Sequence, residues 1–224
     1  MPHANRSAAG DQDIWQRIDS WGVVPVVTLQ DGRTARRLAE ALTAGGLPGA
    51  EVTLRRAGAT AAIEALAKVS EFLVGAGTVH SVRQAEQAVA AGARFVVTPG
   101  FAQDVVAWCL ERSVPVLPGT ATPTDLELAL AHGLERVKFF PAEPLGGVPM
   151  LQALSGPYAA IRFMPTGGID SSNLPSYLEL PSVFACGGSW MVRREWLEHE
   201  AWEQVVRATS QARHAVERAR GGTN

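Results

Sequence analysis

The sequence predicts a single α/β domain folded as a (β/α)8 TIM barrel, and three observations predict it. The chain has 224 residues, of which 46% are hydrophobic and 19% charged, as expected for one large globular core. Apolar, β-rich runs alternate with segments of helical spacing along nearly the whole chain. The strand-like runs are apolar enough for burial on both faces, which is typical of parallel sheets covered by helices.

The elements follow one another in a regular order. We expect residues 1–12 to be a loosely held lead-in, and residues 13–224 to form the barrel, beginning with a short helix over 13–21. Eight strands are predicted at 23–29, 50–54, 72–77, 94–99, 114–119, 136–141, 161–166 and 182–186. Helices are predicted at 31–44, 60–70, 81–92, 102–112, 123–133, 148–155 and 171–179, with a long helical region over 194–220. A doubly wound open sheet is the alternative.

The ends of the predicted strands favour the barrel over the open sheet. Small, turn-forming or hydroxyl residues follow the strands, at Gly77-Thr78, Pro99-Gly100, Gly119-Thr120, Pro141, Thr166-Gly167-Gly168 and Gly187-Gly188-Ser189. Barrel enzymes build their sites on this face, where each strand meets its helix.

Composition limits the kind of partner. A net charge of -2 and a pI near 6.2 give no cationic surplus for nucleic acid, so we expect a small-molecule ligand. No apolar run is long enough to span a membrane, and no secretory pattern is present, so we expect a cytoplasmic protein without membrane contact. Cys109 and Cys186 lack CxxC spacing and the histidines are scattered, which predicts two reduced thiols and no metal site. We also expect no cofactor.

Lys138 is the first candidate for chemistry. It is one of two lysines, against eighteen arginines, and it lies between Val137 and two phenylalanines in a predicted interior strand. Burying an unpaired ammonium costs several kcal/mol, and the usual relief is loss of the proton, which leaves a neutral amine able to form a Schiff base with a carbonyl. Alternatively, Lys138 pairs with a buried carboxylate or extends to the rim.

Two more candidates lie on the second predicted strand. Alternation places Glu51, Thr53 and Arg55 on one face, which turns inward in a barrel because the helices cover the apolar face. Glu51 would move the protons that Schiff-base chemistry requires, and Arg55 offers a fork for a substrate carboxylate. A self-contained ion pair on an edge strand is the alternative, although barrels have no edges.

The glycine pairs after the last two strands suggest a phosphate site. Gly167-Gly168 and Gly187-Gly188 expose backbone N–H groups where helices begin, and Ser189 adds a hydroxyl. Each pair alone more often marks a plain turn, and it is the two pairs on adjacent strands that favour phosphate.

These residues resemble the KDPG/KHG aldolase family of class I aldolases over Leu47 to Val192. The resemblance is carried by Gly45-Gly46-Leu47-Pro48, Glu51-Val52-Thr53-Leu54-Arg55, Val74-Gly75-Ala76-Gly77-Thr78-Val79, Thr98-Pro99-Gly100, Val137-Lys138-Phe139-Phe140-Pro141-Ala142-Glu143, Pro165-Thr166-Gly167-Gly168-Ile169 and Gly187-Gly188-Ser189-Trp190. Two departures are Arg56, where many relatives have threonine, and Ala121-Thr122-Pro123 after the fifth strand.

The resemblance implies roles for these positions. Lys138 would form the Schiff base, Glu51 would be the acid/base and Arg55 would hold the pyruvate carboxylate. Residues implied to line the pyruvyl pocket are Thr78, Pro99, Phe140 and Thr166, and those implied to bind phosphate are Gly167, Gly168, Gly188 and Ser189. It also implies a homotrimer that needs no metal.

The buried-lysine argument and this resemblance together imply a lyase that cleaves 2-dehydro-3-deoxy-6-phosphogluconate, a 2-keto-3-deoxy sugar acid phosphate, to pyruvate and glyceraldehyde 3-phosphate, as in the Entner-Doudoroff pathway. Cleavage of 4-hydroxy-2-oxoglutarate, cleavage of the galactonate epimer and decarboxylation of oxaloacetate by the same imine are alternatives. A phosphosugar-binding module without catalysis is a more distant one.

Overall fold

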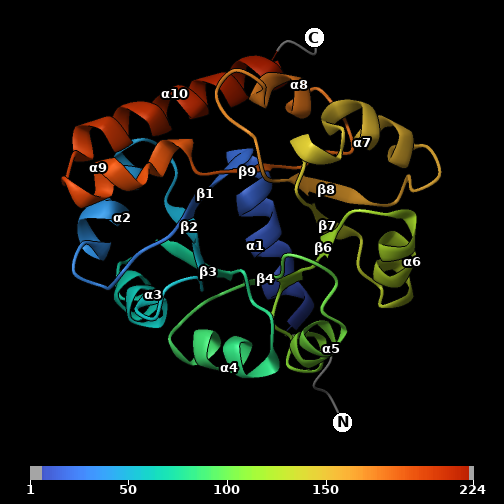
Figure 1. Cartoon of the computed structure of the whole chain (residues 1–224), viewed down its shortest axis with the longest axis horizontal. Helices are drawn as coiled ribbons and strands as arrows, with labels where there is room; N and C mark the ends of the chain where they lie inside the picture. The colour runs from blue at the N-terminus through green and yellow to red at the C-terminus, as the bar shows by residue number, and fades with distance from the viewer. Residues whose placement is uncertain (1–6, 222–224) are drawn as a thin grey trace.

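The computed structural model describes residues 7–221 of the chain, which form a ring of helices around a central set of strands (Figure 1). The strands are β1 (Val23–Val27), β2 (Gly49–Thr53), β3 (Leu73–Gly77), β4 (Val96–Val97), β5 (Val116–Leu117), β6 (Gly119–Thr120), β7 (Arg136–Phe139), β8 (Arg162–Pro165) and β9 (Cys186–Gly188). The helices are α1 (Ser7–Trp21), α2 (Ala35–Ala44), α3 (Ala59–Ala67), α4 (Val82–Ala90), α5 (Gln103–Glu111), α6 (Pro123–Ala131), α7 (Gly147–Ser155), α8 (Leu174–Leu178), α9 (Arg194–Glu198) and α10 (Trp202–Gly221). Two short 3-10 turns, η1 (Glu143–Leu145) and η2 (Trp190–Val192), complete them.

The strands close into the predicted (β/α)8 barrel. Every pairing between strands is parallel, in the orders β5-β4-β3-β2-β1-β9 and β6-β7-β8. Two single parallel bridges, Phe163 with Val183 and Thr166 with Gly187, connect β8 and the residue after it to the segment that leads into β9. The other junction is Pro118, which divides the predicted fifth strand into β5 and β6 because proline has no N–H to donate. An open doubly wound sheet is thereby excluded.

The predicted eighth strand, 182–186, was placed too early. The residues that pair with β1 are Cys186, Gly187 and Gly188, which lie opposite Val23, Val24 and Pro25. Glycine has low β propensity, so the strand was predicted over the apolar residues that precede Gly187. Those residues are buried, but few of them pair with a neighbouring strand. The observed strand brings Gly188 to the mouth of the barrel.

The two ends of the chain also differ in detail from the prediction. Helix α1 begins at Ser7, within the predicted lead-in, because Ala8 and Ala9 favour helix; residues 1–6 lie outside the described residues. The C-terminal helical region is two helices, α9 and α10, separated near Glu200, whose φ of 51° is left-handed.

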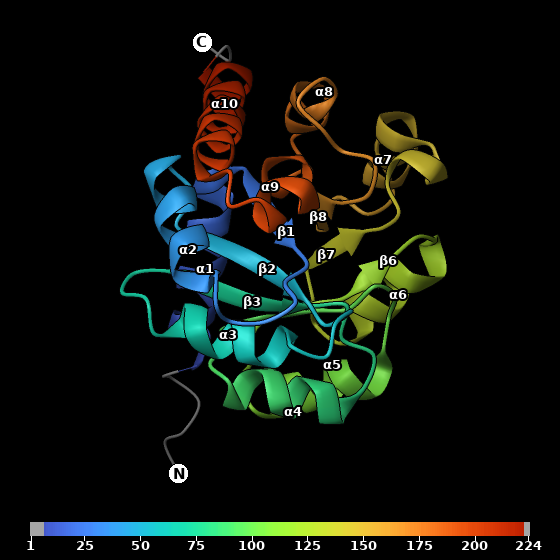
Figure 2. The ribbon, with the colours of Figure 1, turned by 60° about the vertical axis from the view of Figure 1, so that its left-hand side comes forward.

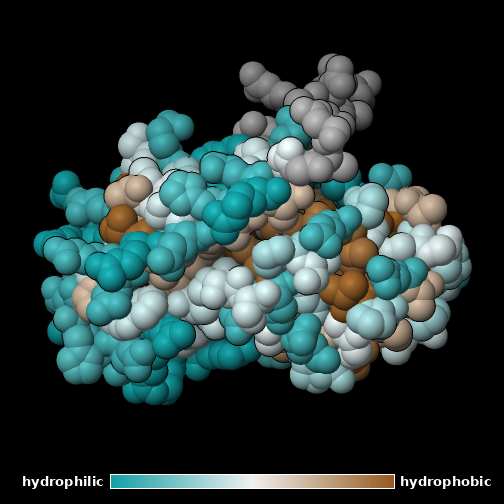
Figure 3. All heavy atoms as spheres, turned by 90° about the horizontal axis from the view of Figure 1, so that it is seen from above, coloured by the Kyte–Doolittle hydropathy of each residue, from teal (hydrophilic) through white to brown (hydrophobic). Residues whose placement is uncertain are grey.

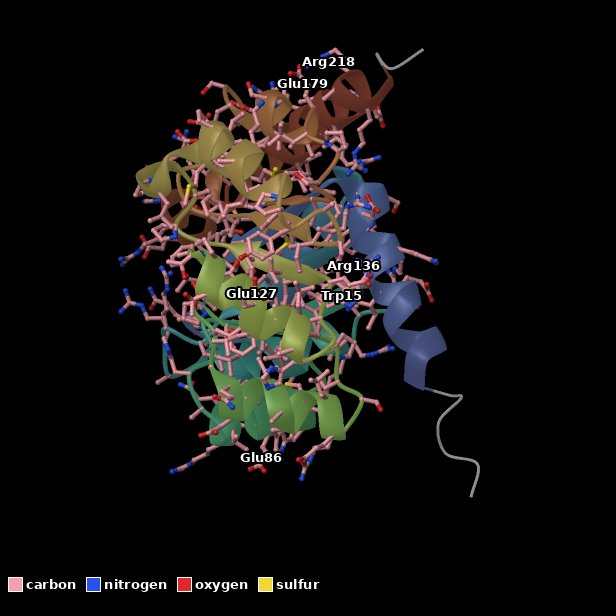
Figure 4. The ribbon with its side chains drawn as sticks, turned by 90° about the vertical axis from the view of Figure 1, so that its right-hand side faces the viewer. Trp15, Glu86, Glu127, Arg136, Glu179 and Arg218 are labelled. Carbon is pink, nitrogen blue, oxygen red and sulfur yellow. The ribbon has the colours of Figure 1, made fainter. Side chains whose placement is uncertain are left out.

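Helix α1 covers the end of the barrel where the strands begin. Trp15 contacts the rings of Phe95 and Phe184, and Trp21 packs on Gly49 at the start of β2. Asp19 pairs with Arg162 of β8 at 3.7 Å and with Arg220 of α10 at 3.2 Å. Figure 4 shows Trp15 directed from α1 toward the barrel, in the region of Arg136. The opposite end of the barrel, where the strands finish, is left for the site.

The remaining helices cover the outside of the barrel. Figure 2 shows α2, α3 and α4 beside β1, β2 and β3, while α10, α8 and α7 lie together on another side. Helix α10 buries Val205, Thr209, Ala212, Ala215 and Val216 and turns its charged residues outward. Seen from that side, the surface is mostly hydrophilic on the left and carries an apolar band right of centre (Figure 3). In the described part of the chain, every helix is too short or too polar to cross a bilayer.

Candidate active site

A buried lysine and a buried glutamate meet inside the barrel. Lys138 of β7 and Glu51 of β2 are 87 residues apart, yet Lys138 Nζ lies 3.3 Å from Glu51 Oε1. Their side chains are 6% and 0% exposed. Removing two charged groups from water is costly, and such a pair is retained where the groups compensate each other or react.

The carboxylate of Glu51 fits its place only because its neighbours are small. A methyl group at Gly77 of β3 would overlap Oε1 of Glu51, so this position admits no side chain. Within residues 7–221, Oε2 of Glu51 has no hydrogen-bond partner. A buried carboxylate oxygen without a partner destabilises the folded protein. This oxygen is free to accept a hydrogen bond from a bound molecule.

The amine of Lys138 is fixed by β7 and by one aromatic ring. The Thr120 hydroxyl donates to the Lys138 carbonyl at 3.1 Å, which ties β7 to β6 at this point. Lys138 Nζ lies 5.2 Å from the centre of the Phe140 ring, within cation–π range. The alternative made from the sequence, that Lys138 pairs with a buried carboxylate, is therefore observed, and the carboxylate belongs to Glu51, the predicted acid/base.

The ends of β3 and β4 bring two further predicted residues to the mouth. Thr78 has a left-handed φ of 58°, which is uncommon outside glycine and often found at functional sites. The Thr98 hydroxyl donates to the Gly100 carbonyl at 2.7 Å and accepts from the Gly119 N–H at 3.3 Å, so it holds the turn that contains Pro99. Thr98 and Thr120 were not predicted as site residues. The feature that could have indicated them is a hydroxyl side chain at the end of an apolar strand.

A cavity of about 1250 Å³ opens at the mouth and is lined by Arg55, Gly168 and Ser189 of the predicted site. Its lining does not include Lys138 or Glu51. Thr53 follows Glu51 on the same face of β2, and its hydroxyl is 2.7 Å from that of Thr28, a lining residue. Through Thr28 and Thr53 the cavity therefore adjoins the strand that carries Glu51.

Two arginines face this cavity without a counter-charge. Arg55 and Arg56 are exposed, and the guanidinium of neither makes a hydrogen bond or ion pair with the described residues. By contrast, Arg194 on the opposite wall pairs with Glu198 at 2.6 Å, and Arg33 with Asp31 at 2.8 Å. The two unpaired guanidiniums are the natural contacts for an anionic ligand.

The glycine turns after β8 and β9 lie on the other side of the cavity. Gly167 and Gly168 have left-handed φ values of 100° and 82°, so the turn requires glycine. Thr166 at its start is buried and lies against Gly187. Gly188 is buried beneath Trp190, whereas Gly168 and Ser189 are exposed to the cavity.

The two departures from the family pattern have different positions. Arg56 lines the cavity, whereas Thr122 caps α6: it accepts from the Asp125 N–H and its own N–H donates to the Asp125 carboxylate. Among the side chains that the structure describes, from residue 14 to residue 221, no group of three His, Cys, Asp or Glu is placed to hold a metal ion.

A closed parallel barrel with charged groups at the carboxyl ends of its strands defines a barrel enzyme. The model of the KDPG and KHG aldolase family matches residues 14–208. The 2-dehydro-3-deoxy-phosphogluconate aldolase of Treponema pallidum is 48% identical over 204 residues, covering 91% of this chain and 97% of that protein. The chain belongs to the KDPG and KHG aldolase family, so it is an aldolase, a carbon–carbon lyase.

Solved structures agree with this assignment. The aldolase of Zymomonas mobilis ZM4, solved with 3-phosphoglycerate, has a TM-score of 0.85 and 39% identity, covering 90% of this chain and 95% of that one. The KDPG aldolase of Legionella pneumophila, with pyruvate captured at low pH as a covalent carbinolamine intermediate, has a TM-score of 0.85 and 39% identity, covering 88% and 97%.

Proposed function

We propose that this chain cleaves 2-dehydro-3-deoxy-6-phosphogluconate to pyruvate and glyceraldehyde 3-phosphate through an imine on Lys138. The observation that carries the proposal is the buried contact of 3.3 Å between Lys138 Nζ and Glu51 Oε1. An enclosed amine with a carboxylate in reach holds both the nucleophile and the proton carrier of the reaction.

The steps follow from this pair. Lys138 passes a proton to Glu51, and the neutral amine attacks the C2 carbonyl of the substrate to form a carbinolamine. Glu51 returns the proton to the hydroxyl, which leaves as water, and the iminium remains. Glu51 then takes the proton of the C4 hydroxyl, and the C3–C4 bond breaks. Glyceraldehyde 3-phosphate is released, and an enamine remains on Lys138. Protonation at C3 and addition of water release pyruvate and restore the amine.

The surrounding residues place the substrate. Arg55 binds its carboxylate, while Thr78, Pro99, Phe140 and Thr166 enclose the pyruvyl part. Gly167, Gly168, Gly188 and Ser189 hold the phosphate, with backbone N–H groups as donors. The Legionella relative carries pyruvate as a carbinolamine and the Zymomonas relative was solved with a phosphorylated three-carbon acid, which supports both ends of this arrangement.

A second candidate reaction is cleavage of 4-hydroxy-2-oxoglutarate to pyruvate and glyoxylate. The family name covers both activities, and the guanidinium of Arg56, which lines the cavity beside Arg55, suits a second carboxylate as well as a phosphate. A substrate panel coupled to pyruvate detection separates them. We expect the highest kcat/KM with the phosphorylated gluconate, and a higher value with the phosphate-free acid would refute our assignment of the substrate.

We also propose that the chain forms a homotrimer. Leu110 of α5 and Leu128 and Leu130 of α6 are the large hydrophobic side chains exposed among the described residues, and all three lie on neighbouring helices. Light scattering after size exclusion should give three times the 23.8 kDa chain mass. The expected cytoplasmic location and independence from metal remain predictions.

A further inference from the structure

The glycine turn of the phosphate end is held by a segment that follows the reactive lysine. Beyond the ends of β7 and β8, three backbone hydrogen bonds continue their pairing: Thr166 N–H to Phe139 O at 2.9 Å, Ala142 N–H to Thr166 O at 2.8 Å and Glu143 N–H to Gly167 O at 3.0 Å. The lysine strand and the turn at 167–168 are therefore one connected unit.

Glu143 is the residue of this segment that contacts the turn most closely. A Cβ built at Gly168 would lie 2.6 Å from both Cβ and Cγ of Glu143, so the aliphatic part of Glu143 packs directly on the Gly168 backbone. Any movement of the Glu143 side chain toward the cavity would displace the turn.

The Glu143 carboxylate is held by Tyr177 of α8. The Tyr177 hydroxyl donates to Glu143 Oε1, and the tyrosine ring is fully buried although Glu143 itself is exposed. Burial, followed by the hydrogen bond to Glu143, raises the pKa of Tyr177 well above its usual value, so the hydroxyl keeps its proton and remains a donor. Gly147 at the start of α7 packs on the same pair, with its built Cβ 2.9 Å from the Tyr177 hydroxyl oxygen.

We infer that Glu143, anchored by Tyr177, is a positioning residue that fixes the Gly167-Gly168 turn for the distal phosphate of the substrate. The inference rests on the proposed function, since it assigns the supporting residues of the phosphate end. Asn173 supports the same turn from the other side, where its amide donates to the Gly168 carbonyl at 2.9 Å.

The test uses Tyr177→Phe, which removes one oxygen and keeps the buried ring. The matched control is Tyr158→Phe, because Tyr158 is the only other tyrosine of the chain and its hydroxyl also donates to a glutamate, Glu127, at 3.0 Å. Glu127 lies on α6, on the outside of the molecule (Figure 4). The two variants make the same chemical change near and away from the turn.

Three quantities are measured in full-length protein: KM and kcat for the phosphorylated substrate, and the pyruvate concentration that half-saturates borohydride trapping. We expect Tyr177→Phe to raise KM for the phosphorylated substrate by about tenfold, equivalent to about 1.4 kcal/mol, and to leave kcat and pyruvate trapping near wild type. Tyr158→Phe should leave all three unchanged.

Glu143 gives an independent pair of variants at an exposed position, which serves if Tyr177→Phe does not fold. Glu143→Ala should raise the same KM, whereas Glu143→Gln should stay near wild type, because its amide oxygen still accepts from Tyr177 and its methylene groups still pack on Gly168. If Tyr177 acted only through the general stability of the protein, Glu143→Gln would not keep the wild-type KM that Glu143→Ala loses.

Two results would overturn the inference while leaving the proposed function intact. One is an active Tyr177→Phe enzyme whose KM matches that of Tyr158→Phe; the other is an equal loss in pyruvate trapping and in phosphorylated-substrate turnover. Failure of the wild-type protein to turn over the phosphorylated substrate would overturn the proposed function and this inference with it.

Discussion

Gly77 of β3 lies against the carboxylate of Glu51 so closely that a methyl group at position 77 would overlap Glu51 Oε1. Glycine at this position therefore determines where the Glu51 carboxylate, the proposed acid/base group, can lie. The backbone of Gly77 is not left-handed, so alanine could adopt the same backbone conformation. Its methyl group would, however, overlap the Glu51 carboxylate.

Gly77→Ala should lower kcat by about a hundredfold, because a shift of about 1 Å in a reacting group has effects of this size. Steady-state kinetics on folded protein, checked by circular dichroism, measure it. Gly156→Ala is the control: position 156 is exposed, away from the site, with its nearest built contact at 3.8 Å. Equal activity of the two variants would show that the position of the Glu51 carboxylate does not depend on glycine at position 77.

The buried ion pair predicts non-additive stability. Lys138→Met leaves the Glu51 carboxylate buried without its cation and should cost about 3–5 kcal/mol in the free energy of unfolding. The double variant Lys138→Met/Glu51→Gln should cost less than the sum of the two single changes, because no uncompensated charge remains. Denaturant unfolding of the four proteins measures the coupling, and strictly additive costs would show that the two groups do not interact.

Arg55 should affect substrate binding more than chemistry. It is exposed, lines the cavity and has no partner among the described side chains, so its guanidinium is free for a carboxylate. Arg55→Lys keeps the charge but loses the two-pronged contact, and should raise KM about tenfold with little change in kcat. Kinetics with the best substrate of the panel provide the test, and a drop in kcat at constant KM would assign Arg55 a different role.

Burial of the thiols predicts a loss of stability at high pH. Burial raises the pKa of Cys109 from 9.0 to about 12, and it also raises the pKa of Cys186. Because the folded-state pKa lies above the unfolded-state value, the unfolded chain releases the Cys109 proton first. The free energy of unfolding should therefore be unaffected by this thiol below pH 9.0 and fall as the pH rises from 9.0 toward about 12.

Denaturant midpoints at a series of pH values measure this fall. Cys109→Ala should reduce the slope, and in native wild-type protein both thiols should resist a thiol reagent at neutral pH. An unchanged slope in Cys109→Ala would contradict the assignment.

The barrel and the burial of Lys138 and Glu51 could be predicted from the sequence because their signals are local. Lys138 is a lone lysine in an apolar strand, and Glu51 alternates with apolar residues on another, so burial followed from neighbours in the chain. In a closed barrel both side chains are predicted to turn into the same enclosure, and the observed contact between them agrees with this prediction.

The supporting contacts could not be predicted in this way. Two of them, the contact of Gly77 with Glu51 and that of Tyr177 with Glu143, join segments that are remote in sequence. Hydrophobic periodicity does not indicate which remote residues contact each other. The last strand was misplaced for a related reason: Gly187 and Gly188 pair through their backbones, which their side chains cannot signal. Gly188 also lies beneath Trp190, a contact visible only in the folded chain.

The most direct test of Schiff-base chemistry is to incubate the protein with pyruvate and sodium borohydride and to map the modified peptide by mass spectrometry. We predict a stable reduced pyruvyl group on Lys138 and none on Lys68, which is exposed and paired with Glu64 at 2.8 Å. An unmodified Lys138 in protein that turns over its substrate would contradict the proposed mechanism.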